Sequence, residues 1–248
     1  MKRIILSVMA SIAMIIALAA GFAPAASATP TTVVGPGTGV TLKTVPHGGA
    51  NDSCSITAVG HDNASRLVAL VAGHCLRDPN NPTQQLPAGQ PIYKTVAPVA
   101  NTQIGVSTGV QAWGGLGTVP QSTLDYAVIE LDPSVVIPSS LSEDGTLSVT
   151  SFGTAGLFQN VCKDGISTGN TCGIIIQASN PNYYKGYASM WNGDSGSPVV
   201  KAGTGVLVAM AVGLDSSNPS QFIYNKIQPV LTDLNAKASY GAGFTLVP

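Results

Sequence analysis

The chain has 248 residues and a formal net charge of −1, and only 9% of its residues are charged, against about 25% in an average domain. No basic patch is visible, which argues against a nucleic-acid-binding protein. The length suffices for one large domain or for two small β-barrels.

Residues 1–28 have the pattern of a secretory signal peptide. Lys2 and Arg3 form a positive start, residues 4–20 form an apolar core, and Ala26-Ser27-Ala28 offers small residues for cleavage. The core is short for a transmembrane span of about 20 residues, and no positive cluster follows it. We therefore expect cleavage after Ala28, a secreted extracellular protein, and no membrane segment in the mature chain.

The first half of the mature chain, residues 29–131, has the pattern of short strands separated by turns. Alternation of apolar and polar residues predicts strands at 40–45, 54–60, 67–72, 92–96, 104–109 and 124–131. The polar run His61-Asp62-Asn63 marks a hairpin tip between the second and third of these strands.

Four cysteines, Cys54, Cys75, Cys162 and Cys172, belong to the mature chain. Disulfides form in the oxidising space outside the cell, and four cysteines allow three pairings. Pairing of sequence neighbours closes two short loops that do not cross. A zinc site is the alternative, but the sequence contains no Cys-x-x-Cys spacing. We expect neither a metal nor a cofactor.

The second half begins after residues 132–145, where Pro133, Pro138 and several serines predict a linker. In residues 146–248, strands are predicted at 146–152, 173–178, 183–188, 197–201 and 206–213, with a hairpin at 162–172. Helical spacing of apolar residues predicts one helix over 226–237. Many short strands with frequent Gly and Pro turns predict an all-β class, and two barrels suit this length better than one.

The run Gly193-Asp194-Ser195-Gly196 is the first of three candidate catalytic segments. A nucleophilic serine needs a sharp turn whose backbone N–H groups point to where an oxyanion will form. Gly193 and Ser195 can supply two such groups. Taken alone, the same residues are also common in ordinary turns.

His74 and Asp125 are the other two candidates. His74 ends a predicted strand beside Cys75, and a general base must be held firmly, because a misplacement of about 1 Å can cost a factor of 100 in rate. Asp125 heads the apolar face of a predicted strand, which is costly without a polar partner such as an imidazole. A structural histidine and a solvent-facing aspartate are the alternatives.

The order of the candidates narrows the chemistry. They occur as His74, Asp125 and Ser195, and no histidine follows His74. This order excludes α/β-hydrolases, whose histidine follows the serine, and subtilisins, whose aspartate precedes the histidine. One known triad order remains.

Three motifs and one hairpin together carry a family resemblance. The motifs are Ala-Gly-His-Cys at 72–75, Asp-Tyr-Ala-Val-Ile at 125–129 and Gly-Asp-Ser-Gly-Ser-Pro at 193–198, and the hairpin spans 162–173. With them, the chain resembles the chymotrypsin-fold (trypsin-like) serine proteases, especially the secreted bacterial branch of streptogrisins and α-lytic protease.

The resemblance implies two antiparallel six-stranded β-barrels and a C-terminal helix, with the site in the cleft between them. The N-terminal barrel, residues 29–131, supplies His74 and Asp125; the C-terminal barrel, residues 146–248, supplies Ser195. It implies a monomeric serine endopeptidase acting on polypeptides, with His74 as the base, Asp125 as its orienting partner, and the N–H groups of Gly193 and Ser195 as the oxyanion hole. A disulfide from Cys54 to Cys75 would staple the loop that bears the base.

Some family features are not identified by the sequence. Asp194 is paired in the family with a freed N-terminus or a basic side chain. Val33-Val34-Gly35 has the pattern of a plain strand. Arg66 and Arg77 are the arginines of the mature chain, and the sequence does not show whether either pairs with Asp194.

The primary substrate pocket also departs from the family pattern. Ser189 stands where the family places the pocket base, so a preference for Lys or Arg is not expected. Val212 and Leu214 match the pocket wall, where a leucine would shorten or block the pocket. Leu214, Trp191 and the short segment before Cys54 favour an alternative, a protease-like secreted binding or surface protein with little or no turnover. An esterase on the same fold is a third possibility.

Overall fold

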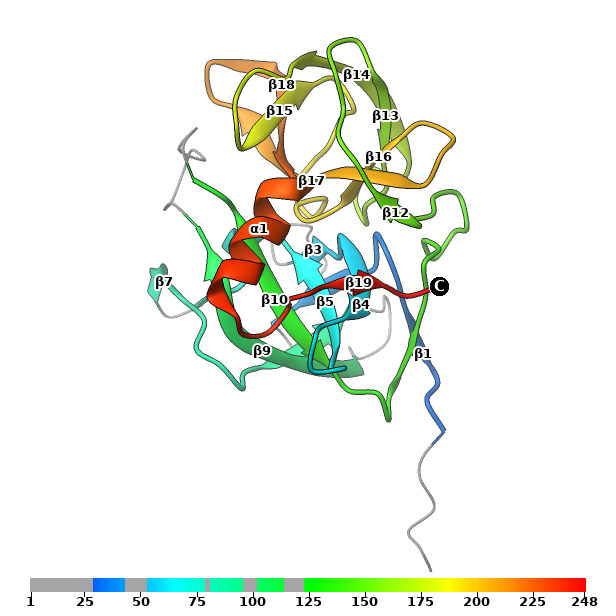
Figure 1. Cartoon of the computed structure of the whole chain (residues 1–248), viewed down its shortest axis with the longest axis vertical. Helices are drawn as coiled ribbons and strands as arrows, with labels where there is room; N and C mark the ends of the chain where they lie inside the picture. Colours follow the sequence, from blue (N-terminus) through cyan, green and yellow to red (C-terminus); the bar gives the residue numbers. More distant parts are fainter. Residues whose placement is uncertain (1–28, 43–52, 79–80, 96–101, 114–122) are drawn as a thin grey trace, which may run out of the picture.

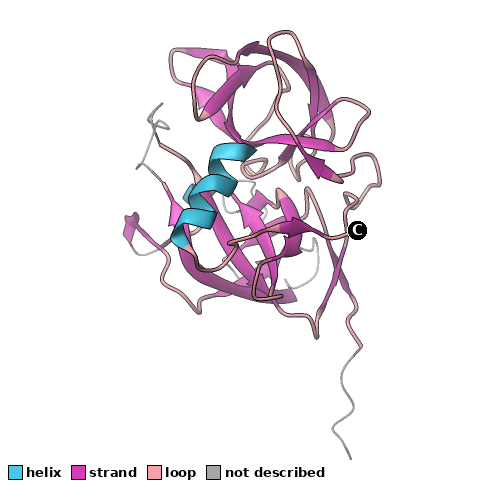
Figure 2. Ribbon diagram, in the orientation of Figure 1, coloured by secondary structure: helices cyan, strands magenta, loops and turns pink. Residues whose placement is uncertain are grey.

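The computed structural model describes residues 29–42, 53–78, 81–95, 102–113 and 123–248. The predicted signal peptide lies outside these ranges. The described chain forms two β-structured halves, with one α-helix lying along both of them (Figures 1 and 2). The predicted all-β architecture with a C-terminal helix is confirmed. No helix in the described ranges is long and apolar enough to cross a membrane.

The N-terminal half is one curled sheet with the strand order β19-β4-β5-β10-β9-β8-β2-β3. Its strands are β2 Gly39–Thr41, β3 Ser53–Ser55, β4 Ala58–His61, β5 Leu67–Val71, β8 Pro91–Lys94, β9 Thr102–Ala112, β10 Tyr126–Leu131 and β19 Thr245–Leu246. The sheet therefore has eight strands where six were expected. One addition, β19, comes from the C-terminal tail, which returns from the helix and pairs with β4.

The side-chain pattern of β10 explains its central place in this sheet. Ala127, Ile129 and Leu131 point into a core cluster of the N-terminal half, to which Val136 of the linker and Val247 of the C-terminal tail also belong. Tyr126 and Val128 point to the other face, into a cluster shared with the helix and the C-terminal half. Both faces of β10 are thus buried, and the strand pairs with β5 on one side and β9 on the other.

The C-terminal half is a closed barrel. Its strand order is β12-β17-β16-β13-β14-β15-β18, and a further pairing of β17 with β18 closes six of these strands. The strands are β12 Ser151–Phe152, β13 Asn160–Lys163, β14 Thr171–Gln177, β15 Tyr183–Gly186, β16 Pro198–Lys201, β17 Val206–Asp215 and β18 Asn218–Lys226. The predicted six-stranded barrel is confirmed in this half.

Two short strand pairs lie outside the two large sheets. In the predicted linker, β11 Val136–Pro138 pairs in parallel with β1 Thr32–Val34. The segment between the halves therefore also binds the N-terminal part of the described chain. The other pair is β6 Arg77–Asp78 with β7 Asn81–Gln85.

Helix α1, Ile227–Lys237, confirms the predicted helix and joins the two halves. Ile227, Val230 and Leu234 are fully buried in the shared cluster. This cluster also contains Leu70 of the N-terminal half and Met210 of the C-terminal half. Because one helix face contacts both halves, it helps to fix their relative position.

We predict that Leu234→Ala lowers the free energy of unfolding by about 2–5 kcal/mol, because it leaves a cavity in the shared cluster. The control is Gln228→Ala on the exposed face of the same helix, with an expected change within about 0.5 kcal/mol. Urea unfolding followed by tryptophan fluorescence measures both. Equal losses in the two variants would contradict the described packing of α1.

Candidate active site

The candidate base, His74, lies in a 3-10 turn, Gly73–Cys75, that follows β5 after one residue, Ala72. Cys75 is bonded to Cys54 in strand β3, which lies at one end of the strand order of the N-terminal sheet. On the other side, Arg77 Nε donates a hydrogen bond of 2.7 Å to the His74 carbonyl oxygen. A disulfide and a hydrogen bond therefore restrain the backbone that carries the imidazole.

Asp125 is fully buried at the start of β10 and contacts His74 through both carboxylate oxygens. Its Oδ2 lies 2.6 Å from His74 Nδ1, and its Oδ1 accepts the His74 backbone N–H at 2.8 Å. The carboxylate thus selects the tautomer with the proton on Nδ1. The second nitrogen, Nε2, then carries the free lone pair.

The backbone of Asp125 is held by a residue that the sequence did not reveal. Its N–H donates to Asn225 Oδ1 at 2.5 Å, and Asn225 is fully buried on β18 of the other half. This strand was not predicted, because it begins with the polar run Asn218-Pro219-Ser220. No sequence pattern therefore placed Asn225 near Asp125.

Ser195 sits in the turn before β16, between glycines whose backbone favours a left-handed conformation. Gly193 has φ +100° and Gly196 has φ +89°, values that side chains disfavour. A Cβ on Gly196 would lie 2.1 Å from the Ser55 carbonyl oxygen. The turn therefore needs glycine at these positions.

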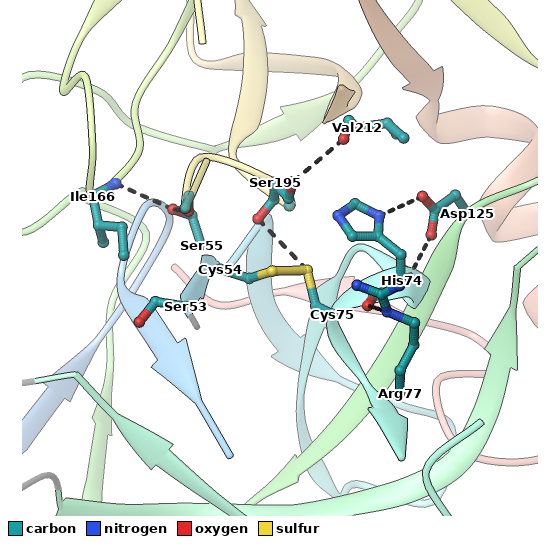
Figure 3. The surroundings of a disulfide bond; sticks show 12 residues. Ser53, Cys54, Ser55, His74, Cys75, Arg77, Asp125, Ile166, Ser195 and Val212 are labelled. Atoms are coloured by element: carbon teal, nitrogen blue, oxygen red, sulfur yellow. Dashed lines mark hydrogen bonds and ion pairs between the residues drawn. A yellow bond between two sulfur atoms is a disulfide. The ribbon is translucent and has the colours of Figure 1, made fainter. Parts of the chain in front are cut away.

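The His74 imidazole lies between Asp125 and Ser195 (Figure 3). The Ser195 hydroxyl donates to the Val212 carbonyl at 3.3 Å. In the described chain, its hydrogen bond therefore goes to β17 and not to His74. The three predicted catalytic residues are nevertheless brought together where the two halves meet.

Two hydroxyl side chains of the N-terminal half restrain the serine turn. Ser55 Oγ donates to the Gly193 carbonyl at 2.9 Å, and Thr57 Oγ1 donates to the Gly196 carbonyl at 2.6 Å. The Ser55 N–H also donates to the Ser195 carbonyl at 2.7 Å. Among the described residues, the N–H groups of Gly193 and Ser195 have no acceptor.

Asp194 is paired with Lys163, a residue that the sequence did not identify as its partner. The two side chains are fully buried, and Lys163 Nζ lies 3.1 Å from Asp194 Oδ2. Lys163 directly follows Cys162, which is bonded to Cys172 at the base of the predicted hairpin. Both predicted disulfides are confirmed, and the hairpin supplies the basic partner.

Asp194 also accepts hydrogen bonds from the Thr168 hydroxyl, at 2.6 Å, and the Trp191 N–H, at 2.9 Å. Burial acts to raise the pKa of Asp194, but these hydrogen bonds and the Lys163 charge outweigh it and hold that pKa below its ordinary value. Burial lowers the pKa of Lys163, against the opposing effect of Asp194. The turn next to Ser195 is thus anchored by a carboxylate that stays ionised.

The three residues predicted to form the substrate pocket differ in how far they are buried. Val212 is buried, whereas Ser189 is exposed and its carbonyl accepts a hydrogen bond from the Thr171 hydroxyl. Leu214 is 48% exposed and lies opposite Phe222 in the pairing of β17 with β18. Sequence reasoning missed Phe222 because β18 was not predicted.

A metal centre at this site is disfavoured by its donor chemistry. Donor atoms of Cys54, His74 and Cys75 lie within 4.8 Å of one another. The two sulfurs form a disulfide, whereas zinc is bound by cysteine as the thiolate. One imidazole then remains as a ligand, which is too few for a protein site.

Two largely antiparallel β-structured halves, one of them a closed six-stranded barrel, have the architecture of the chymotrypsin fold, and the serine turn and the His–Asp pair lie where these halves meet. The chain matches no protein-family model and no curated protein sequence. Similar proteins are found by comparison of structures.

The structure resembles Thermobifida fusca protease A with a TM-score of 0.58 and 19% identity, over 87% of this chain and 99% of that protein. It resembles Cellulomonas bogoriensis chymotrypsin with a TM-score of 0.53 and 18% identity, over 87% and 98%. A glutamic-acid-specific serine protease has a TM-score of 0.58 and 16% identity, over 86% and 100%. The fold is therefore that of bacterial chymotrypsin-like serine proteases.

We predict that Lys163→Met lowers the free energy of unfolding by about 3–5 kcal/mol, because it leaves the Asp194 carboxylate buried without its cation. Lys201→Met, which removes a partly exposed lysine from the adjacent strand β16, is expected to change it by less than about 0.5 kcal/mol. Urea unfolding at neutral pH compares the two. Similar losses of unfolding free energy in the two variants would show that the buried ion pair contributes no more to stability than the partly exposed lysine does.

The stability should also depend on pH through Asp194. Its pKa is lower in the folded protein than its ordinary value of 3.8, so the unfolded chain takes up this proton first as the pH falls. The contribution is present in full above that ordinary value and is lost as the pH falls through the folded pKa.

We therefore expect Asp194→Asn to be less stable than the wild type at neutral pH but to lose less stability below about pH 4. Urea unfolding at a series of pH values gives the two curves. Parallel curves would contradict the lowered pKa of Asp194.

Proposed function

We propose that this protein is a secreted serine endopeptidase that hydrolyses peptide bonds through an acyl-enzyme. The observation that carries the proposal is the placement of the His74 imidazole, which Asp125 holds in one tautomer beside Ser195. The fold supports it, because the similar structures are serine proteases. The two disulfides agree with export.

In the first half-reaction, Ser195 Oγ forms a bond to the carbonyl carbon of the substrate, and its proton moves to His74 Nε2. The carbonyl oxygen becomes an oxyanion that the free N–H groups of Gly193 and Ser195 bind. Asp125 stabilises the imidazolium and does not take the proton itself. The tetrahedral centre then collapses, the C–N bond breaks, and His74 gives its proton to the leaving amine.

In the second half-reaction, water replaces the amine. His74 Nε2 takes a proton from the water as its oxygen attacks the acyl carbon. A second oxyanion forms in the same place, the bond to Ser195 Oγ breaks, and His74 returns the proton to the serine. The acid product leaves, and the residues regain their starting states.

The substrate we propose is a polypeptide without a charge requirement at the primary pocket. Ser189 offers no carboxylate for a Lys or Arg side chain. The glutamic-acid-specific neighbour is described as using a histidine triad in substrate binding. This chain has only three histidines, and one of them, His74, is the proposed base, so the same device has too few residues here.

We predict that a fluorophosphonate probe labels the folded protein and fails to label Ser195→Ala, because the probe reacts with an activated serine oxygen. Intact mass spectrometry counts the added group, and circular dichroism checks that the variant is folded. Heat-denatured wild type serves as the control for non-specific labelling. Equal labelling of wild type and variant would refute the assignment of Ser195.

A second candidate is a protease-like binding or surface protein. It is favoured by the Ser195 hydrogen bond to Val212 and by the place of Leu214 on the pocket-wall strand. Digestion of an unbiased peptide library separates the two functions. Probe labelling together with cleavage supports the endopeptidase, whereas probe labelling without cleavage supports the binding protein.

A further inference from the structure

The loop of the hairpin between β13 and β14 touches the serine turn through Ser167, which the proposed mechanism does not use. The Ser167 hydroxyl donates a hydrogen bond to the Asn192 carbonyl oxygen. The Ser167 N–H donates to Asp194 Oδ1 at 2.9 Å. Ser167 therefore binds the turn at two points, directly before the candidate nucleophile.

The Asn192 carbonyl and the Gly193 N–H belong to the same peptide unit. In a trans peptide, the C=O and N–H bonds point in opposite directions from a rigid plane. A hydroxyl that holds the carbonyl on the hairpin side therefore directs the N–H away from the hairpin. In agreement, the Gly193 N–H has no acceptor within the described chain.

This peptide unit needs such a restraint more than its neighbours. It ends at Gly193, whose φ is +100°, and glycine tolerates both signs of φ at little cost. Rotation of the unit by a half turn would point the N–H at the hairpin and place a carbonyl oxygen where an oxyanion must bind. The next unit is held separately, since Ser55 Oγ donates to the Gly193 carbonyl at 2.9 Å.

We propose that Ser167 is a positioning residue for the oxyanion hole, which acts by fixing the orientation of the Asn192–Gly193 peptide. The inference rests on the proposed function, because it assigns the Gly193 N–H a role in that reaction. The hairpin then acts on the serine turn in two ways. Lys163 neutralises Asp194 from inside, and Ser167, which is exposed, holds the adjacent peptide from outside.

The test compares Ser167→Ala, Ser167→Thr and a matched control, Ser139→Ala. Ser139 is a partly exposed serine whose hydroxyl likewise donates to a backbone carbonyl, that of Leu141 at 3.0 Å, but it lies outside the site. The measurements are kcat and KM for one peptide substrate, and the affinity for phenylboronic acid, which adds to a serine oxygen as a tetrahedral anion. Thermal unfolding midpoints show whether the variants differ in stability.

Loss of one oxyanion donor lowers kcat by about 100- to 1000-fold. Ser167→Ala leaves the donor in the chain but frees its orientation, so we expect kcat to fall by about 10- to 100-fold on the same basis. The affinity for phenylboronic acid should fall by a similar factor, with KM nearly unchanged. Ser167→Thr should restore most of the loss, because it restores the hydroxyl, and Ser139→Ala should behave as the wild type.

Three results would overturn the inference. If Ser167→Ala keeps the wild-type kcat and boronic acid affinity while Ser195→Ala is inactive, the proposed function stands and the role of Ser167 is wrong. If the wild type neither cleaves peptides nor binds phenylboronic acid, the proposed function is wrong and the inference falls with it. A fall in kcat that Ser139→Ala reproduces would likewise reject a specific role for Ser167.

Discussion

Hydrogen bonds between the two halves are the constraint on which the rest of the site depends. Asn225 of the C-terminal barrel binds the backbone of Asp125, which belongs to the N-terminal sheet. In return, Ser55 and Thr57 of the N-terminal half bind the turn that carries Ser195. Each half thus orients a candidate catalytic residue of the other. A small shift between the halves would disturb both residues at once, and rates are sensitive to displacements of about 1 Å.

The chain has few charged residues, and two of them form a buried ion pair next to the candidate site. Only 9% of the residues are charged, yet Lys163 and Asp194 form a fully buried pair beside the serine turn. Removing two charges from water is costly, so a buried pair is weak evidence for stability. Its value here is geometric: Asp194 accepts N–H groups from the hairpin and from Trp191, which joins two loops to one carboxylate next to Ser195.

Local sequence patterns predicted the features that depend on residues close together in the chain. Strand alternation predicted β10, helical spacing predicted α1, and the pairing of neighbouring cysteines predicted both disulfides. Motif order singled out His74, Asp125 and Ser195 as catalytic candidates. The partners that act across the fold were missed. Lys163 follows Cys162 in a hairpin that was itself predicted, but only the pairing of β13 with β16 brings it to Asp194. Asn225 lies on β18, which was not predicted because the strand begins with polar residues. The strand β19 pairs with β4 across the fold, and no local pattern indicates that pairing.

The hydrogen bond of the Ser195 hydroxyl distinguishes the two candidate functions less well than the residues around Ser195 do. The backbone of the serine turn is held by Ser55, so the Ser195 hydroxyl changes its hydrogen-bond partner by rotation about one side-chain bond. A hydrogen bond of 3.3 Å between neutral groups contributes about 0.5–1.5 kcal/mol net, which corresponds to no more than about a tenfold change in population. That factor is too small to separate an enzyme from an inactive relative. The element to test is therefore the proposed pocket wall on β17, where Leu214 pairs with Phe222, two residues from Val212, whose carbonyl accepts the Ser195 hydrogen bond.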